Sequence, residues 1–288
     1  MAIDVLIKQK LFGNKTMPLE IILGDNLHYG TYEQDRLNTG ELGEGEFIAY
    51  NPQSIGRGFS VIWNPAENKN IALRLPVPST IAELKDFYLC VERMVNYWGG
   101  KLIVDGNKTS LDSFMAGLDE MIAFNERTLK DIASRVISGE HDTLTLYSAM
   151  WPLDMGKEEA ETFLNSPEKY AEWLHEKQSA EVYFPSPDLY MGDNGVFGVY
   201  TLISGIPTVL PYKPTVPYSA VNPKTGKPLE CKKWVVLLGI RGEKNPLCEM
   251  NYSVLLQKLP KEKMSRFDGK HFLLAELTQE EIKNIAKQ

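Results

Sequence analysis

The strongest helix signal in this chain is Thr80 to Gly100, which reads TIAELKDFYLCVERMVNYWGG. Thr80 and Glu83 form a capping box, in which the threonine hydroxyl accepts from a backbone N–H and the glutamate carboxylate reaches back. Apolar side chains then recur at three- and four-residue steps as far as Trp98, and Gly99-Gly100 ends the helix. One face of this helix must therefore be buried, and a sheet is predicted beneath it.

Short strands are expected before this helix. Residues 2–8 alternate between apolar and polar side chains, which is typical of a half-buried strand. Further strands are predicted at 19–23, 47–50, 59–63 and 71–75. The last three are joined by connections too short for crossovers, so they are expected to pair antiparallel. Residues 24–46, rich in Gly, Asn, Asp and Glu, indicate a mobile surface loop.

The middle of the chain is predicted to be helical and the last third to be rich in strands. Helical spacing covers 110–136, with Asn125 as a candidate break, and two more helices are expected at 157–164 and from Ser166-Pro167. Strands are predicted at 143–149, 182–184, 196–203, 234–240, 252–256 and 272–277. A second capping box, Thr278 with Glu281, begins a short terminal helix.

This order of strands, helices and strands predicts the α+β class. The expected architecture is one or more mostly antiparallel sheets with amphipathic helices packed on one face, and the helices concentrated in the middle of the chain. The predicted organisation is a single compact unit over 1–288. The alternative is two halves, a strand-then-helix half at 1–178 and a strand-rich half at 179–288.

The charge is distributed unevenly. Residues 1–207 contain 17 Lys and Arg against 30 Asp and Glu, a balance of −13, whereas residues 208–288 contain 14 against 8, a balance of +6. Two parts of one fold that attract each other would explain this pattern, and so would an acidic face offered to a basic partner. The acidic total of −7 argues against nucleic acid as the main partner.

A cytoplasmic protein is predicted from three observations. The three cysteines are odd in number and form no Cys-x-x-Cys pair, the N-terminus lacks a signal-peptide pattern, and no apolar run is long enough for a membrane-spanning helix. No membrane partner is expected. No cofactor and no metal site are predicted either, because none of the four histidines belongs to a zinc motif. Cys231 precedes Lys232 and Lys233, and nearby cations lower the pKa of a thiol. Cys231 is therefore the most reactive cysteine expected, although an ordinary surface or strand residue is the preferred interpretation.

Two stretches carry a resemblance to a known family. Ile55-Gly-Arg-Gly-Phe59 leads into a strand, and Leu73-Arg-Leu-Pro-Val-Pro-Ser-Thr-Ile-Ala-Glu83 leads into the capped helix. Together they resemble a bacterial domain-of-unknown-function family of stand-alone α+β proteins of about this size. The resemblance spans the whole chain and implies a bacterial cytosolic protein. It carries no catalytic residues, because the family has none assigned.

The candidate binding residues are few. Arg57, between two glycines, is placed to clamp a carboxylate or a phosphate. His28 and Tyr29 follow Asp25 in the glycine-rich segment and have the chemistry for acid–base work, but the sequence shows no third group to position them. Tyr212 belongs to an aromatic and proline-rich region that favours either a peptide-binding surface or a loop packed on a sheet. Loop packing is the preferred interpretation of that region.

Two hypotheses for function follow. The preferred one is a non-enzymatic protein-binding module, such as an immunity or adaptor protein, that binds another protein through its acidic 1–207 surface or its proline-rich 207–228 loop. The alternative is an enzyme of unrecognised type, with a site formed by the 24–46 loop, Arg57 and the 207–228 loop. No catalytic residue is predicted, since the chain lacks P-loop and nucleophile-elbow motifs.

Overall fold

A computed structural model shows an α+β fold, which confirms the predicted class. It describes residues 1–10, 13, 15–33, 35–42, 45–64, 69–193, 195–217, 220–222, 225–227 and 229–287. The described residues form eight α-helices and four sheets. No helix among them is both long enough and apolar enough to cross a membrane.

The chain divides into two compact units. The first is Met1–Glu33 with Leu37–Ser179, and the second is Gln34–Arg36 with Ala180–Gln288. The boundary after Ser179 lies one residue beyond the boundary between the two halves considered from the sequence. The choice between one domain and two stays a prediction.

The first unit is built on an eight-stranded sheet with the order β3-β2-β4-β5-β6-β1-β7-β8. Strand β1 lies inside the sheet, where it pairs antiparallel with β6 and with β7. Its side chains Ile3, Val5 and Ile7 are buried, as the alternating pattern predicted. The strands are β1 (Ala2–Lys8), β2 (His28–Glu33), β3 (Arg36–Thr39), β4 (Glu46–Tyr50), β5 (Phe59–Ile62), β6 (Asn70–Pro76), β7 (Lys101–Val104) and β8 (Asn107–Thr109).

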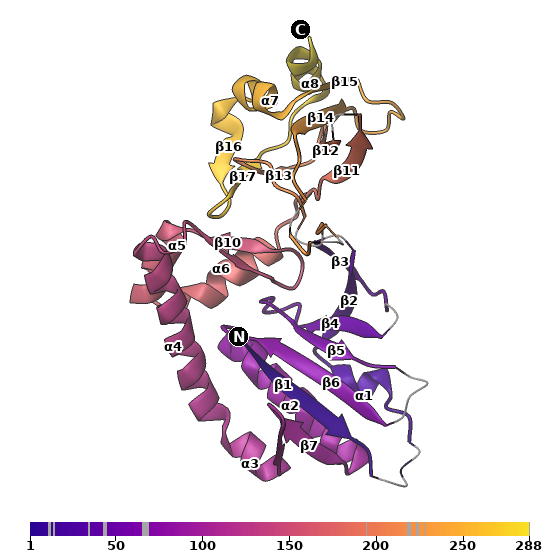
Figure 1. Cartoon of the computed structure of the whole chain (residues 1–288), viewed down its shortest axis with the longest axis vertical. Helices are drawn as coiled ribbons and strands as arrows, with labels where there is room; N and C mark the ends of the chain where they lie inside the picture. The colour runs from indigo at the N-terminus through magenta and orange to yellow at the C-terminus, as the bar shows by residue number, and fades with distance from the viewer. Residues whose placement is uncertain are drawn as a thin grey trace. The chain divides into compact units, whose positions relative to one another are not determined.

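Helix α2 (Ile81–Trp98) covers one face of this sheet, behind β1 and β6 in Figure 1. The predicted capping box is present: Glu83 N donates to Thr80 Oγ1 at 3.0 Å, and Thr80 N donates to Glu83 Oε2 at 3.1 Å. Gly99 ends the helix in the left-handed conformation, with φ 57°. The rings of Phe87 and of Phe59 in β5 meet edge to face, with centroids 5.3 Å apart, and join the helix to the sheet.

Two predictions in the first unit were wrong. The predicted strand at 19–23 is helix α1 (Leu19–Leu23), whose Ile22 and Leu23 are buried; a five-residue apolar run does not distinguish a strand from a helix. The predicted loop at 24–46 contains the strands β2 and β3. Gly30 lies where a Cβ would come 2.5 Å from Asn38 O, so this glycine permits close strand approach rather than marking a loop. Positions 34, 43 and 44 lie outside the described residues.

The helical segment beyond the sheet breaks at Gly117 and not at Asn125. Asn125 is buried within the second of the two helices, where Oδ1 accepts from Ser79 N at 2.7 Å and Nδ2 donates to Ser79 O at 2.8 Å. A small two-stranded sheet and two further helices complete the unit. The elements are α3 (Leu111–Ala116), α4 (Leu118–Ile137), β9 (Leu144–Leu146), β10 (Leu153–Met155), α5 (Lys157–Asn165) and α6 (Lys169–Gln178).

The second unit contains two sheets, with the orders β11-β12-β14-β15 and β13-β17-β16. Strands β12 and β14 run parallel. Its core includes Tyr200, Leu238, Tyr252 and Phe272. The elements are β11 (Asp188–Gly192), β12 (Gly195–Ile203), β13 (Thr208–Pro211), β14 (Lys233–Gly239), β15 (Cys248–Asn251), α7 (Tyr252–Lys258), a 3₁₀ turn (Lys261–Lys263), β16 (Met264–Arg266), β17 (His271–Leu274) and α8 (Gln279–Ala286).

Three predictions in this unit also need correction. The segment 252–256 is helical, as part of α7, and 182–184 contributes only an isolated bridge between Tyr183 and Thr208. The predicted loop at 207–228 begins with β13, an edge strand that includes Pro211 as its last residue. An edge strand can include proline because the missing N–H leaves no hydrogen bond of the sheet unmade. Positions 218, 219, 223, 224 and 228 of that loop lie outside the described residues.

Candidate functional site

Arg57, the predicted anion clamp, donates hydrogen bonds to two main-chain carbonyls. Its Nε donates to Tyr147 O at 3.0 Å, and its Nη1 donates to Pro78 O at 3.0 Å. The guanidinium also lines a cavity of about 310 Å³ that includes Arg74. Arg74 pairs with Asp4 at 3.2 Å, and both of these side chains are more than half exposed. Arg57 therefore ties three chain segments together, and its role as an anion clamp stays a prediction.

The structure explains why Gly56 and Gly58, the residues on either side of Arg57, are glycines. The buried carboxylate of Glu83 accepts from Gly58 N as well as from the start of α2. A Cβ on Gly56 would lie 2.3 Å from Glu83 Oε2, and Gly58 has φ +69°. Burial raises the pKa of Glu83, while the amides of Thr80 and Gly58 and the charge of Arg57 act in the opposite direction. The Gly-Arg-Gly turn is thus folded around the carboxylate that caps α2.

His28 and Tyr29, the predicted acid–base pair, are consecutive residues of strand β2, so their side chains lie on opposite faces of the sheet. Successive side chains of a β-strand point to opposite faces. Tyr29 packs edge to face against Phe47, with ring centroids 5.9 Å apart, on the side of the sheet that α2 covers. His28 is exposed and meets the ring of Tyr50 at 6.1 Å. The structure therefore does not bring these two side chains together.

In the second unit, Tyr212 lies just after β13. Its ring packs on that of Phe272 with centroids 5.4 Å apart, and its backbone N donates to Lys270 O at 2.9 Å. The side chain is still 46% exposed, so it is accessible to a partner. Burial raises the pKa of Cys231, in contrast to the lowering expected from Lys232 and Lys233. This direction is the one expected for the preferred interpretation of Cys231, an ordinary surface or strand residue.

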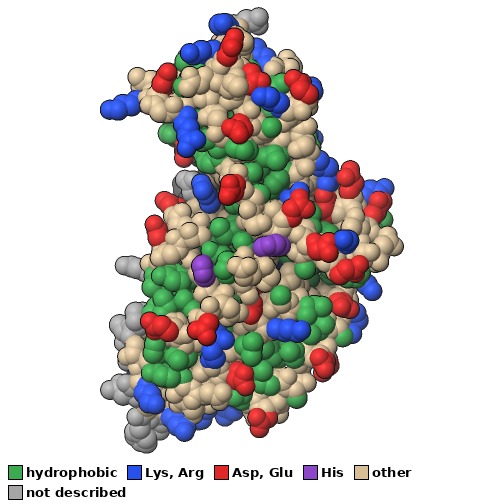
Figure 2. All heavy atoms as spheres, turned by 180° about the vertical axis from the view of Figure 1, so that it is seen from behind, with side chains coloured by type: hydrophobic (Ala, Val, Ile, Leu, Met, Phe, Trp, Pro, Cys, Tyr) green, Lys and Arg blue, Asp and Glu red, His purple; other side chains and the backbone are tan. Residues whose placement is uncertain are grey.

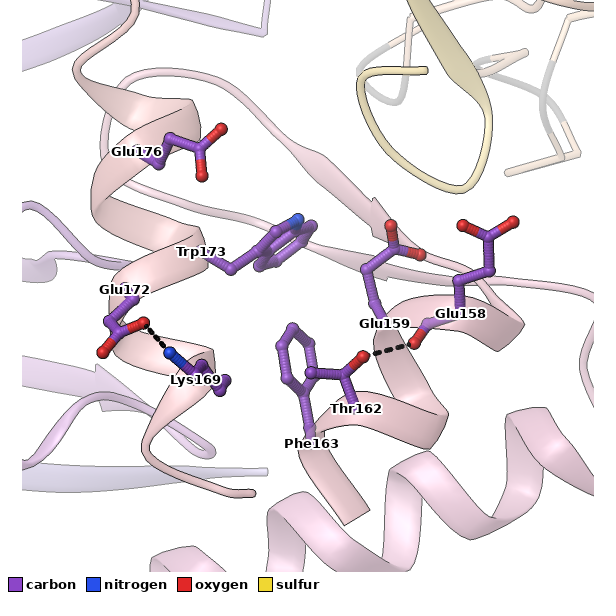
Figure 3. A pocket seen from close by; sticks show the side chains of 8 residues that line it. All are labelled: Glu158, Glu159, Thr162, Phe163, Lys169, Glu172, Trp173 and Glu176. Carbon is purple, nitrogen blue, oxygen red and sulfur yellow. Dashed lines mark hydrogen bonds and ion pairs between the residues drawn. The ribbon is translucent and has the colours of Figure 1, made fainter. Parts of the chain in front are cut away.

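A second pocket of the first unit lies between α5 and α6 and is shown in Figure 3. It has a volume of about 270 Å³. Phe163 and Trp173 form its apolar wall, with ring centroids 5.4 Å apart and planes at 60°. The lining residues are Glu158, Glu159, Thr162, Phe163, Lys169, Glu172, Trp173 and Glu176.

Each helix positions its acidic side chains through local interactions. Glu159 Oε2 accepts from Gly156 N at 3.0 Å and so caps the start of α5, where a negative charge is favourable. On α6, Lys169 Nζ lies 2.7 Å from Glu172 Oε2. Lys177 Nζ lies 2.9 Å from Glu176 Oε1. The lining residues contribute four carboxylates and one ammonium group, and Lys177 beside the pocket supplies a second, so Glu172 and Glu176 each have a lysine partner.

The Trp173 indole adds an unsatisfied group to this pocket. Its Nε1 is buried and has no hydrogen-bond partner among the described residues. A buried donor without an acceptor costs about 1–3 kcal/mol. In Figure 3 the ring projects from α6 into the space between the helices, and its nitrogen faces away from Phe163. The pocket therefore combines acidic side chains with an aromatic wall, while the unsatisfied donor of that wall is covered and has no accessible surface.

The carboxylates of this pocket are not arranged for a metal ion. No three acidic or histidine side chains lining it bring ligand atoms within 4.8 Å of one another in the described part of the chain. Carboxylates that lie this far apart fit an organic cation better than a metal ion, because a metal ion requires oxygen ligands that converge on one point. The chemistry that this pocket can perform is recognition of a positively charged side chain or amine.

The pocket belongs to a larger acidic segment. Residues 118–178, which contain α4, α5 and α6, carry 13 Asp and Glu against 6 Lys and Arg, a balance of −7. Figure 2 shows red side chains gathered at its right-hand edge, over the segment that contains α5 and α6. About half of the excess of −13 in residues 1–207 therefore lies in this segment, partly in the helices and partly in the stretches between them.

The sequence alone does not reveal this pocket. Helices are predicted at 157–164 and from Ser166-Pro167, but the pattern of a single helix does not show which helices face each other. The sequence does contain one signal for the pocket: Glu172, Trp173 and Glu176 place an aromatic ring near two carboxylates on one helix. Sequence analysis also missed a buried pair in the second unit, where His271 Nδ1 lies 2.9 Å from Asp268 Oδ1. The same Asp268 oxygen accepts from the backbone N of Lys270 and of His271, so the pair closes the turn before β17.

Three comparisons with known proteins complete this description. The model of one protein family, described as "Domain of unknown function (DUF4299)", matches residues 2–285. Neither the comparison with curated proteins nor the comparison with solved structures gave a match. The first result agrees with the family resemblance of the two motifs that meet at Glu83.

Proposed function

The chain belongs to the DUF4299 family, and we propose that it is a non-enzymatic protein-binding module of the immunity or adaptor kind. Its partner presents a basic segment, which docks on the acidic segment 118–178, which contains α4, α5 and α6. The observation that carries this proposal is the pocket between α5 and α6, where four glutamates and one lysine surround an aromatic wall.

The charge pattern supports a protein partner. A concentrated negative charge steers a basic partner towards the surface and gives the association a strong dependence on salt. Aromatic side chains such as Trp173 supply the apolar contact at which binding energy is usually concentrated. A surface with negative charge alone would repel nucleic acid and would lack this anchor.

The proposal extends to the cellular setting. The three cysteines, Cys90, Cys231 and Cys248, are free. Free thiols favour a reducing compartment, and together with the family resemblance they support the proposal that the protein works in a bacterial cytoplasm.

A direct binding measurement tests the proposed function. The probe is a fluorescein-labelled peptide of alternating Lys and Arg, compared with one of alternating Glu and Ser, in fluorescence anisotropy with the full chain. The basic peptide is expected to bind and the acidic one is not, and binding should weaken at least about tenfold between roughly 50 and 500 mM salt. Failure of the basic peptide to bind at low salt would refute the proposal.

Matched variants locate the surface. The triple variant Glu158→Gln, Glu172→Gln, Glu176→Gln removes three exposed charges beside the pocket and is expected to weaken binding about tenfold. The control Glu20→Gln, Asp25→Asn, Glu41→Gln removes three exposed charges elsewhere in the first unit and should weaken binding by no more than about twofold. Equal effects of the two variants would mean that net charge alone attracts the peptide, and the acidic segment 118–178 would then not be the docking surface.

A further inference from the structure

We propose that the face of the eight-stranded sheet opposite to α2 binds a second copy of this chain. The two copies are related by a two-fold axis that runs parallel to the strands, between β1 and β6. This face is separate from the acidic segment 118–178, so the pairing does not depend on the proposed function. Three properties of the face support it: an accessible apolar row, charges that match those of a second copy, and sufficient area.

The face opposite to α2 is open to solvent in the first unit. In Figure 1, α2 lies behind β1 and β6, so the other face of these strands is turned towards the viewer. Asp4, Lys8 and Arg74 on this face are exposed. Ile62 in β5 is 53% exposed there, although isoleucine is among the residue types most often buried.

A row of cross-strand neighbours crosses this face through six strands. Residues that are directly opposite each other in an antiparallel pair lie on the same face of the sheet. The four central members of the row are apolar and accessible to solvent, and a charged residue lies at each end. Apolar surface rimmed by charged side chains is typical of a protein–protein interaction site. In order, the row is Lys108, Ile103, Leu6, Ala72, Ile62 and Glu46.

A second copy matches this row residue for residue. Two identical surfaces that meet face to face are related by a two-fold axis in the plane of the interface. An axis parallel to the strands, between β1 and β6, reverses the row in the second copy. Leu6 then faces Ala72 of the partner subunit, and Ile103 faces Ile62 of the partner subunit. The apolar centre of the row is thereby covered by the same centre of the other copy.

The central charges of the face are complementary under the same rotation. Asp4 and Arg74 are direct cross-strand neighbours on β1 and β6, with Oδ1 and Nη1 3.2 Å apart, and both side chains are more than half exposed. The rotation places Asp4 opposite Arg74 of the partner subunit and Arg74 opposite Asp4 of the partner subunit. Two exposed ion pairs, each of little value alone, then form a network of four charges between the copies.

The charges at the two ends of the row also match. Lys108 comes to face Glu46 of the partner subunit, and Glu46 faces Lys108 of the partner subunit. Neither residue has an ion-pair partner in its own chain, as far as the described residues extend. The pairing of the copies therefore supplies an opposite charge to two groups that lack one, and complementary charges fix the register of an interface.

The area of the face is at the lower limit for a stable dimer. Its three rows pass through Asp4, Leu6 and Lys8. With strands about 4.8 Å apart and same-face residues about 6.8 Å apart, six strands and three rows cover roughly 590 Å². The two copies together then bury about 1,200 Å², the size at which specific interfaces begin. We therefore expect a dimer that dissociates at about 1–100 µM.

Zero-length cross-linking of the full chain tests the register. Lys108 and Glu46 of one chain lie five strand spacings apart, about 24 Å, which is too far for a carbodiimide to join the amine to the carboxylate. An equal mixture of ¹⁴N- and ¹⁵N-labelled chains at about 100 µM should give a Lys108–Glu46 cross-linked peptide of hybrid mass in mass spectrometry. Hybrid cross-links only between other residues would overturn the proposed pairing.

Charge reversal tests the contact at the axis. Sedimentation velocity of the full chain between about 1 and 200 µM should show a dimer. Arg74→Asp and Asp4→Arg should each weaken self-association at least about tenfold, because like charges then meet across the axis. An equal mixture of the two variants should restore the dimer, since every charge at the axis again faces its opposite. A wild type that stays monomeric, or single variants that dimerise as the wild type does, would overturn the proposal.

A matched pair of apolar positions tests the row itself. Ile62→Asp should weaken the dimer at least about tenfold, because it places an unpaired charge against the apolar centre of the second copy. Leu89→Asp changes an exposed leucine of α2, on the other side of the sheet, and should weaken the dimer by no more than about twofold. Equal effects of the two variants would contradict the proposed face. If Ile62→Asp fails to fold, as judged by circular dichroism, the cross-link in the wild type still decides the question.

Discussion

The carboxylate of Glu83 accepts a hydrogen bond from the main-chain amide of Gly58, which lies 25 positions earlier in the chain. The same carboxylate accepts from Thr80 N at 3.1 Å. One side chain therefore closes the start of α2 and also fixes the turn that leads into β5. The two motifs that carry the family resemblance, one on each side of this contact, are parts of a single structural element.

Replacement of Glu83 by alanine should destabilise the first unit strongly. Glu83→Ala leaves the buried amides of Thr80 and Gly58 without their acceptor, and we expect a loss of about 2–4 kcal/mol in the free energy of unfolding. Urea denaturation followed by circular dichroism measures this loss. Glu92→Ala, at a partly exposed position on the same helix, should change stability by less than about 0.5 kcal/mol. Similar losses in the two variants would contradict the role assigned to Glu83.

The Gly56 position should depend on Glu83. Gly56→Ala would place a Cβ 2.3 Å from Glu83 Oε2, so either the turn or the carboxylate must move, at a cost of about 1–3 kcal/mol. In a double-mutant cycle with Glu83→Ala this cost should largely disappear, because the atom that clashes is gone. An additive cycle would show that Gly56 is needed for another reason.

The cysteines should differ in their reaction with iodoacetamide. Burial raises the pKa of Cys90 to about 12, and the residue has no exposed surface. At about pH 8 the folded protein should therefore react at Cys248 and more slowly at Cys231, whose pKa is also raised by burial, while Cys90 stays unmodified. Peptide mass spectrometry identifies the sites, and all three should react in urea. Modification of Cys90 in the folded protein at the rate of Cys248 would contradict the structure.

The second unit should lose stability in acid through Glu281. Hydrogen bonds from Lys263 and from Thr278 lower the pKa of Glu281 from 4.5 to about 2. A carboxylate with a depressed pKa in the folded state stabilises that state above its unfolded pKa, and this contribution fades as the pH falls from 4.5 towards 2. Glu281→Gln should therefore unfold more easily than the wild type at about pH 7. The difference should shrink below pH 4.5, and thermal unfolding at several pH values checks this. A difference that stays constant with pH would count against the ion pair as its cause.

Local signals in the sequence predicted the parts of the fold that are held by local interactions. The capping boxes at Thr80 and Thr278, the glycine after Trp98 and the alternation in β1 involve residues a few positions apart, and the structure confirms all of them. Short apolar runs gave wrong predictions at α1 and α7, because five to seven residues satisfy both a helical and a strand pattern.

Long-range interactions decided the rest. The parallel pairing of β12 with β14 joins segments about thirty residues apart, and the sequence of neither strand shows whether it pairs parallel or antiparallel with the other. The candidate pocket shows the same limit: Glu159 and Trp173 were assigned to helices, but their meeting depends on how α5 packs beside α6. Arg57 was predicted as an anion clamp, and its hydrogen-bond partners in the structure are carbonyl groups 21 and 90 positions away, which no local pattern indicates.

The position of β1 inside the eight-stranded sheet has a consequence for protein synthesis. Residues 2–8 are synthesised well before their two neighbouring strands, which are at 70–76 and 101–104. At translation rates of roughly 5–20 residues per second, this apolar segment spends several seconds with both of its edges open to other chains. The nascent protein is therefore exposed to aggregation until β7 has been made, and a chaperone that shields residues 2–8 should raise the yield of folded protein.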